Sequence, residues 1–276
     1  MTKKNSPELH APAPRKPFWR TELEQMARLG APIVFTQLAW VAMLTTDTAM
    51  IGRLGPDALA GASLSLMVFF LTWVFCFGVV MATAALASQA FGARKPRMVR
   101  RVIRQGFWVT IILTVPAMML FPFTPDLLRV LSQPAHILPH ADAYMSTLMW
   151  CLMPSIGFAV VRNFISSLNR PAPALWVMLA GVPLNALLDY ALIYGNFGLP
   201  RLELVGAGIA TSAVNWLMFL ALLAIAVFRK PFSRSPILGR FWRPGWFLFR
   251  PVLRLGRSPA RSCLLVAGCF CSSLSL

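Results

Sequence analysis

The most regular feature of the chain is a series of long apolar segments separated by short polar ones. The segments that contain no Asp, Glu, Lys or Arg are residues 31–46, 58–93, 105–125, 143–161 and 204–228. A sixth, residues 171–194, is interrupted by one charged residue, Asp189. Because about 20 apolar residues in a helix cross a hydrocarbon core ~30 Å thick, each segment is read as a membrane span. The pattern predicts an all-α integral membrane protein with six transmembrane helices.

Charge agrees with this interpretation and orients the six helices. The chain is 57% hydrophobic and 13% charged, with a net charge of +17. The connections rich in Lys and Arg are residues 1–28, 94–104 and 229–254, whereas the others contain little more than Arg53, Arg129 and Arg201. This alternation places both ends of the six-span unit in the cytoplasm. Nucleic-acid binding is disfavoured, because it needs basic residues gathered on a folded polar surface.

The polar segments divide the chain into four parts. Residues 1–24 are basic and rich in Pro, as expected of a cytoplasmic tail without a cleaved signal peptide, and residues 25–228 hold the six spans. Residues 229–256 alternate Arg with aromatic side chains, which is typical of an amphipathic linker on a cytoplasmic membrane face. Residues 257–276 are rich in Ser, Arg and Cys with an apolar core too short to span, so we expect an aberrant tail.

The candidate chemistry is confined to two acids inside the spans. Asp47 and Asp189 stand out because a carboxylate in hydrocarbon is costly and is seldom placed there without a task. Asn185 lies four residues before Asp189, on the same helix face. These groups suit a proton or Na⁺, with no further metal or cofactor. The alternative is that each acid pairs with a buried base such as Arg162.

Enzymatic chemistry finds little support in the sequence. There is no phosphate-binding loop, no Gly-x-Ser-x-Gly element and no His-Glu-x-x-His, and the three histidines lie outside the spans. The five cysteines show neither a zinc-like spacing nor an even extracellular framework. We therefore expect a protein that is not an enzyme.

Four motifs in order along the chain resemble the multidrug and toxic compound extrusion family. They are LTTDTAMIGRLG at 44–55, ASQAFG at 87–92, PLNALLDYALIYGNFG at 183–198 and VGAGIAT at 205–211. The resemblance extends over residues 28–228 and implies the amino-terminal six-helix lobe of a twelve-helix transporter. It also implies export of cationic or amphipathic drugs across the bacterial inner membrane, in exchange for H⁺ or Na⁺.

The resemblance further implies a cation-coupling site in this lobe. By motif match the site consists of Asp47, Asp189, Asn185 and Thr211, with Asn163 and Tyr144 as looser matches. Sodium-linked relatives often have Asn where this chain has Asp189, and Gln where it has Trp40. The coupling ion, H⁺ or Na⁺, therefore stays open.

The second lobe of the family is absent, and after Gly256 the expected span is replaced by the Ser- and Cys-rich tail. This pattern suggests a truncated or frameshifted reading frame. Because alternating access moves one lobe against another, a single lobe needs the missing lobe or a second copy for transport. The alternatives are a non-functional half-transporter and a lipid or polysaccharide flippase of the same superfamily.

Overall fold

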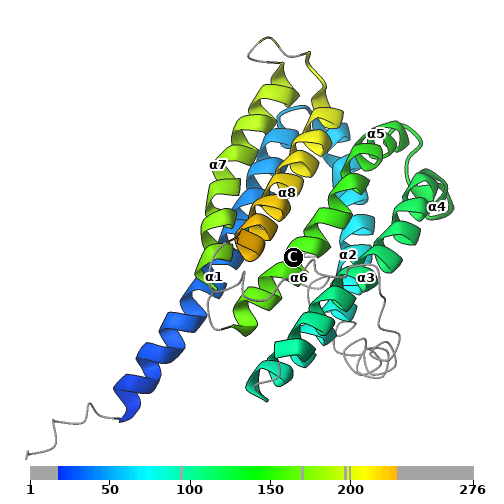
Figure 1. Ribbon diagram of the computed structural model, residues 1–276. Helices are drawn as coiled ribbons and strands as arrows, with labels where there is room; N and C mark the ends of the chain where they lie inside the picture. The colour runs from blue at the N-terminus through cyan, green and yellow to red at the C-terminus, as the bar shows by residue number, and fades with distance from the viewer. Residues whose placement is uncertain (1–17, 94–95, 169–170, 196–197, 199, 229–276) are drawn as a thin grey trace, which may run out of the picture.

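The computed structural model describes residues 18–93, 96–168, 171–195, 198 and 200–228, which form a bundle of helices (Figure 1). The α-helices are α1 (Phe18–Gly52), α2 (Pro56–Gly92), α3 (Pro96–Leu120), α4 (Thr124–Val130), α5 (Leu138–Leu148), α6 (Leu152–Ser167), α7 (Ala172–Tyr194) and α8 (Glu203–Phe228). Two short 3₁₀ helices, η1 (Phe121–Phe123) and η2 (Met149–Cys151), link α3 to α4 and α5 to α6. The expected cytoplasmic linker and aberrant tail lie outside the described residues, as does most of the amino-terminal tail.

The six predicted spans are confirmed among the described residues. The segments long and apolar enough to cross a membrane are Gly30–Gly52, Pro56–Met81, Arg101–Val130, Leu138–Ser167, Ala172–Tyr194 and Glu203–Phe228. α2 runs for 37 residues as one helix, about 55 Å at the helical rise, and so exceeds the hydrocarbon thickness. The chain is a multi-pass, all-α membrane protein.

The fourth span is built from two helices rather than one. α5 and α6 follow each other through η2, and Pro154 stands in the first turn of α6. Proline has no backbone N–H and its ring clashes with the preceding turn, so regular α-helical hydrogen bonding is interrupted at this point. The span extends from Leu138 to Ser167, beyond the uncharged residues 143–161 on both sides.

The connections with little positive charge share one end of the bundle. The α1–α2 and α4–α5 connections lie at the upper end in Figure 1, together with the end of α7 and the start of α8. His136 before α5 and Asp57 at the start of α2 approach within 3.8 Å at this end. The Arg53, Arg129 and Arg201 segments are thus grouped as the charge alternation predicts.

Close helix crossings at glycine hold the bundle together. A Cβ at Gly61 of α2 would lie 2.7 Å from the Cβ of His140 on α5. A Cβ at Gly206 of α8 would lie 2.6 Å from the carbonyl oxygen of Leu192 on α7. Small residues at such crossings let the helix backbones approach, which is the main source of packing energy inside lipid. The α7–α8 crossing fixes the helices that carry three of the candidate site residues.

Candidate functional site

Four of the predicted site residues meet where α1, α7 and α8 come together. Asp47 is on α1, Asn185 and Asp189 are one turn apart on α7, and Thr211 is on α8. Their exposed fractions are 4% for Asp47, 8% for Thr211 and 0% for both α7 residues. Three helices therefore place these polar groups inside the lobe, away from lipid.

Asn185 joins the two acids. Its amide nitrogen Nδ2 donates one hydrogen bond to Asp47 Oδ1 across the helix interface and another to Asp189 Oδ2, at 2.8 Å, within α7. A single amide with two N–H groups thus holds two acids side by side.

The Thr211 hydroxyl can bond to Asp47 whether Asp47 is ionised or protonated. Its hydroxyl lies 3.2 Å from Asp47 Oδ2 and 3.0 Å from the carbonyl oxygen of Ala207. A hydroxyl has one proton to donate, so it cannot donate to both oxygens at once. Ionised Asp47 accepts a hydrogen bond from the Thr211 hydroxyl. Protonated Asp47 can instead donate a hydrogen bond to Thr211, while Thr211 donates to the carbonyl oxygen of Ala207. The contact accommodates both states of Asp47 without moving a helix.

Two acceptor oxygens in the cluster have no hydrogen-bond partner among the residues that the structure describes. They are Asn185 Oδ1 and Asp189 Oδ1, and both are buried. Among the described residues neither Asp47 nor Asp189 forms an ion pair with a basic side chain. Together with Asp47 and Thr211, these oxygens form an all-oxygen donor set, the type that Na⁺ and other hard cations prefer.

The structure does not support pairing of the acids with Arg162. Arg162 of α6 donates from Nη1 to Gln37 Oε1 of α1 at 3.2 Å. Gln37 lies ten residues before Asp47 in α1, about 15 Å along the helix axis. The guanidinium group thus serves a different level of the bundle, and the buried acids keep their own partners.

The two looser matches fall in different places. Tyr144 of α5 is buried in one apolar cluster with Ile51 and Ile193, each one turn beyond an acid of the cation cluster. Asn163 of α6 instead contacts Met81 of α2, with Nδ2 and Sδ 3.5 Å apart. The structure brings Tyr144 near the cluster and leaves Asn163 outside it.

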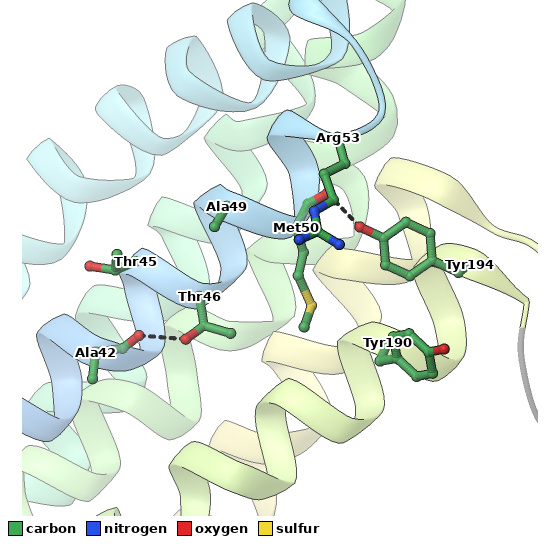
Figure 2. Close-up of a pocket in the computed structure, with 8 residues that line it drawn as sticks. All are labelled: Ala42, Thr45, Thr46, Ala49, Met50, Arg53, Tyr190 and Tyr194. Carbon is green, nitrogen blue, oxygen red and sulfur yellow. Dashed lines mark hydrogen bonds between the residues drawn. The ribbon is translucent and has the colours of Figure 1, made fainter.

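Sequence reasoning did not identify a groove on the outer side of the same helix pair. Its lining residues, shown in Figure 2, are Ala42, Thr45, Thr46, Ala49, Met50, Arg53, Tyr190 and Tyr194. We call it the α1–α7 groove. Its volume is about 530 Å³. The available signal was the spacing of small residues on α1 together with two tyrosines four residues apart on α7.

A family comparison decides the class of protein. The family model for MatE matches residues 32–191, which is more than half of the chain. The chain is 43% identical over 255 residues to a probable multidrug resistance protein NorM from Bradyrhizobium diazoefficiens, with 92% of this chain and 55% of the relative covered. This chain belongs to the multidrug and toxic compound extrusion family.

Other relatives and solved structures agree with that placement. A probable multidrug resistance protein NorM from Rhodopseudomonas palustris is 42% identical over 260 residues, covering 94% of this chain and 55% of the relative. The structure of a multidrug resistance family transporter in an outward-facing conformation matches with a TM-score of 0.76 at 23% identity, covering 87% of this chain and 52% of that one. The latter likeness shows the fold. The chain spans about half the length of the curated relatives it matches.

Proposed function

We propose that the chain is the cation-coupling lobe of a multidrug efflux antiporter, which exports cationic or amphipathic drugs in exchange for H⁺ or Na⁺. The observation that carries this proposal is the buried cluster of Asp47, Asn185, Asp189 and Thr211. Kinship with proteins named for multidrug resistance supplies the substrate class.

The physical argument concerns the charge of the cluster. Two adjacent carboxylates without a basic partner among the described residues repel each other and are poorly solvated inside the lobe. Uptake of one proton or one Na⁺ lowers that cost, and release restores it. Because the cluster residues lie on α1, α7 and α8, binding or release of the cation changes how strongly α1 is held against α7 and α8.

Proton and Na⁺ use the same atoms here. A proton on either acid satisfies one carboxyl oxygen, and the Thr211 hydroxyl can turn toward Ala207 to accept from Asp47. A Na⁺ ion would take Asp189 Oδ1 and Asn185 Oδ1 with oxygens of Asp47 and Thr211. Neither ion requires a residue from outside α1, α7 and α8.

Export requires a second six-helix unit in this proposal. Alternating access moves one lobe against another around a central path, and the relatives are about twice the length of the matched region. The partner is a carboxy-terminal lobe or a second copy of this one. We further propose location in a bacterial inner membrane, with the connections near Arg53, Arg129 and Arg201 facing the periplasm.

The decisive experiment separates cation binding from export. Binding of Na⁺ to the purified chain is measured by titration calorimetry, and proton release on Na⁺ addition is followed with a pH dye. Asp47→Asn and Asp189→Asn should abolish the signal, since Asn keeps the size of Asp without its charge. Asp142→Asn on the exposed face of α5 is the matched control.

Export is tested in a chimera that joins this chain to the carboxy-terminal half of the Bradyrhizobium relative. The chimera should lower the accumulation of a cationic dye in a drug-sensitive host, and either acid substitution should remove that effect. Wild-type efflux in both variants would disprove the coupling role. Labelling of a cysteine at Arg129, but not at Arg97, by an impermeant reagent from outside the cell tests the orientation.

A further inference from the structure

Small side chains line the α1 side of the α1–α7 groove. Ala42, Thr45, Thr46 and Ala49 follow one face of α1, at spacings of three and four residues. The Thr45 and Thr46 hydroxyls donate to carbonyl oxygens of their own helix, at 2.9 and 2.8 Å. They therefore need no polar ligand, and this part of the groove can accept an apolar one.

The other end of the groove is polar and positively charged. Arg53 stands just beyond α1, exposed, and forms no ion pair with the residues that the structure describes. Tyr194 lies beside it, with its hydroxyl donating to the carbonyl oxygen of Met50 at 3.2 Å (Figure 2). Tyr190 packs against Tyr194 with ring centroids 5.7 Å apart. Arg and Tyr at this level are typical of a membrane–water interface.

The length of the groove matches one leaflet of a bilayer. From Ala42 to Arg53 is eleven residues, about 16 Å along the helix at its usual rise. Half of a hydrocarbon core is ~15 Å. The apolar end thus lies near the bilayer centre when Arg53 lies at the surface. On α7, Leu187 lies one turn before Tyr190 and is exposed, as expected of a lipid-facing surface.

We propose that the α1–α7 groove binds one phospholipid, with the lipid phosphate on Arg53 and one acyl chain along the small residues of α1. Arg binds phosphate oxygens through a planar fork of N–H groups, which gives a strong, oriented contact. The groove volume of about 530 Å³ falls in the usual range for ligand sites. This proposal stands independently of drug efflux.

Charge argues against a cationic drug as the occupant. Arg53 is the charged member of the groove lining, so a cation at this end would be repelled. The groove is also separate from the acidic cluster, although both lie along the α1–α7 interface. Asp47 comes directly after Thr46, and Asp189 comes directly before Tyr190. Both acids are nevertheless buried on the inner side of their helices, away from the groove. A lipid in the groove would therefore lie against the helices that carry the acids.

The test is native mass spectrometry of the purified 276-residue chain, titrated with phosphatidylglycerol in detergent. The wild type should retain one lipid, and Arg53→Gln should weaken its binding by about tenfold or more, as expected for loss of a charge-assisted contact. Arg129→Gln is the control, because Arg129 lies at the same end and already pairs with Asp126 at 3.1 Å. Diacylglycerol with the same chains should bind no better to the wild type than to Arg53→Gln.

A second substitution tests the acyl-chain part of the site. Ala42→Phe fills the apolar end of the groove, eleven residues before Arg53 along the chain, and should weaken phosphatidylglycerol binding while leaving inorganic phosphate binding unaffected. Arg53→Lys keeps the positive charge but lacks the planar set of N–H donors, so it should bind the lipid with intermediate strength. Such graded binding would show that the loss in Arg53→Gln does not come from misfolding. Unchanged lipid binding in both Arg53→Gln and Ala42→Phe would overturn the proposal.

Two further outcomes would also overturn it. Inorganic phosphate that displaces the lipid completely from the wild type at equal concentration would identify a phosphate site rather than a lipid site. Loss of lipid retention when the chain is joined to the carboxy-terminal half of its Bradyrhizobium relative would mean that protein covers the groove. Lipid retained by the chimera, and lost with Arg53→Gln, supports the assignment.

Discussion

The span made of α5 and α6 and the span made by α1 are built in opposite ways. In an apolar 18-residue stretch of the Leu138–Ser167 span 67% of the residues are buried inside the bundle, against 22% in the corresponding stretch of the Gly30–Gly52 span. The first supplies large, fully buried side chains such as Ile156 and Ile165. The second exposes apolar side chains such as Val34 and Leu38 and packs chiefly along α7.

Packing stability and the candidate chemistry reside in different helices of this lobe. α5 and α6 form the scaffold, through apolar contacts with α2, α3 and α8. α1 has fewer such contacts, and polar groups fasten it to its neighbours: Asp47 to Asn185 and Thr211, and Met50 to Tyr194. These polar contacts add to the packing of α1 along α7 and join the acid of α1 directly to both neighbouring helices. We expect changes at the cluster to loosen α1 more than the scaffold.

The largest contrast is expected for truncations in the two spans. Ile156→Ala on α6 removes a side chain that is 0% exposed and should lower the free energy of unfolding by about 2–4 kcal/mol. Val34→Ala on α1, where the residue is 57% exposed, should change it by less than about 0.5 kcal/mol. Unfolding by graded denaturing detergent, followed by circular dichroism, measures both. Equal losses would mean that α1 is as deeply packed as α6.

The next effect concerns the amide that joins α1 to α7. Asn185→Leu removes the amide donor that the two buried carboxyl groups share, which should lower the free energy of unfolding by about 1–3 kcal/mol. Asn215→Leu is the control, because Asn215 donates within its own helix to the Thr211 carbonyl oxygen. The same unfolding assay applies, together with protease sensitivity near the start of α1. If both variants were equally stable, the amide bridge would not hold α1.

The six transmembrane helices could be predicted from the sequence, because an uncharged segment of membrane length has few structures open to it other than a spanning helix. The place of Asp47, Asp189, Asn185 and Thr211 was predicted as well, from helical spacing for the α7 pair and from family motifs for the rest. Their roles in coupling remain predictions. Asn163 contacts Met81 and lies outside the cluster, and its part in the site stays a prediction. Successive residues on a helix point toward different neighbouring helices, and a motif match does not determine which neighbour a side chain such as Asn163 contacts.

The α1–α7 groove could not be predicted in the same way. It depends on how closely two helices approach and on which residues flank their contact, and neither follows from hydropathy. Arg53 looked like an ordinary residue of a short connection. Only the packing of α1 on α7 places it beside Tyr194.

A smaller effect is expected where a neutral hydrogen bond fastens the outer end of α1. Tyr194→Phe removes the donor to the Met50 carbonyl oxygen and should lower the free energy of unfolding by about 1 kcal/mol. Tyr190→Phe is the matched control, because Tyr190 donates no hydrogen bond to any residue that the structure describes. A larger loss for Tyr190→Phe than for Tyr194→Phe would contradict the role given to the Met50 contact.

The smallest effect should come from Thr211, which touches the cluster from the side of α8. Thr211→Ser keeps the hydroxyl that reaches Asp47 at 3.2 Å, so Na⁺ affinity and the free energy of unfolding should stay close to wild type. Thr211→Val keeps the shape and removes the hydroxyl, which should weaken cation binding by about fivefold, equivalent to one neutral hydrogen bond. Titration calorimetry on both variants measures the difference. Because Thr211 also bonds to Ala207 within its helix, loss of affinity in Thr211→Ser would show that the methyl group, rather than the oxygen, positions Asp47.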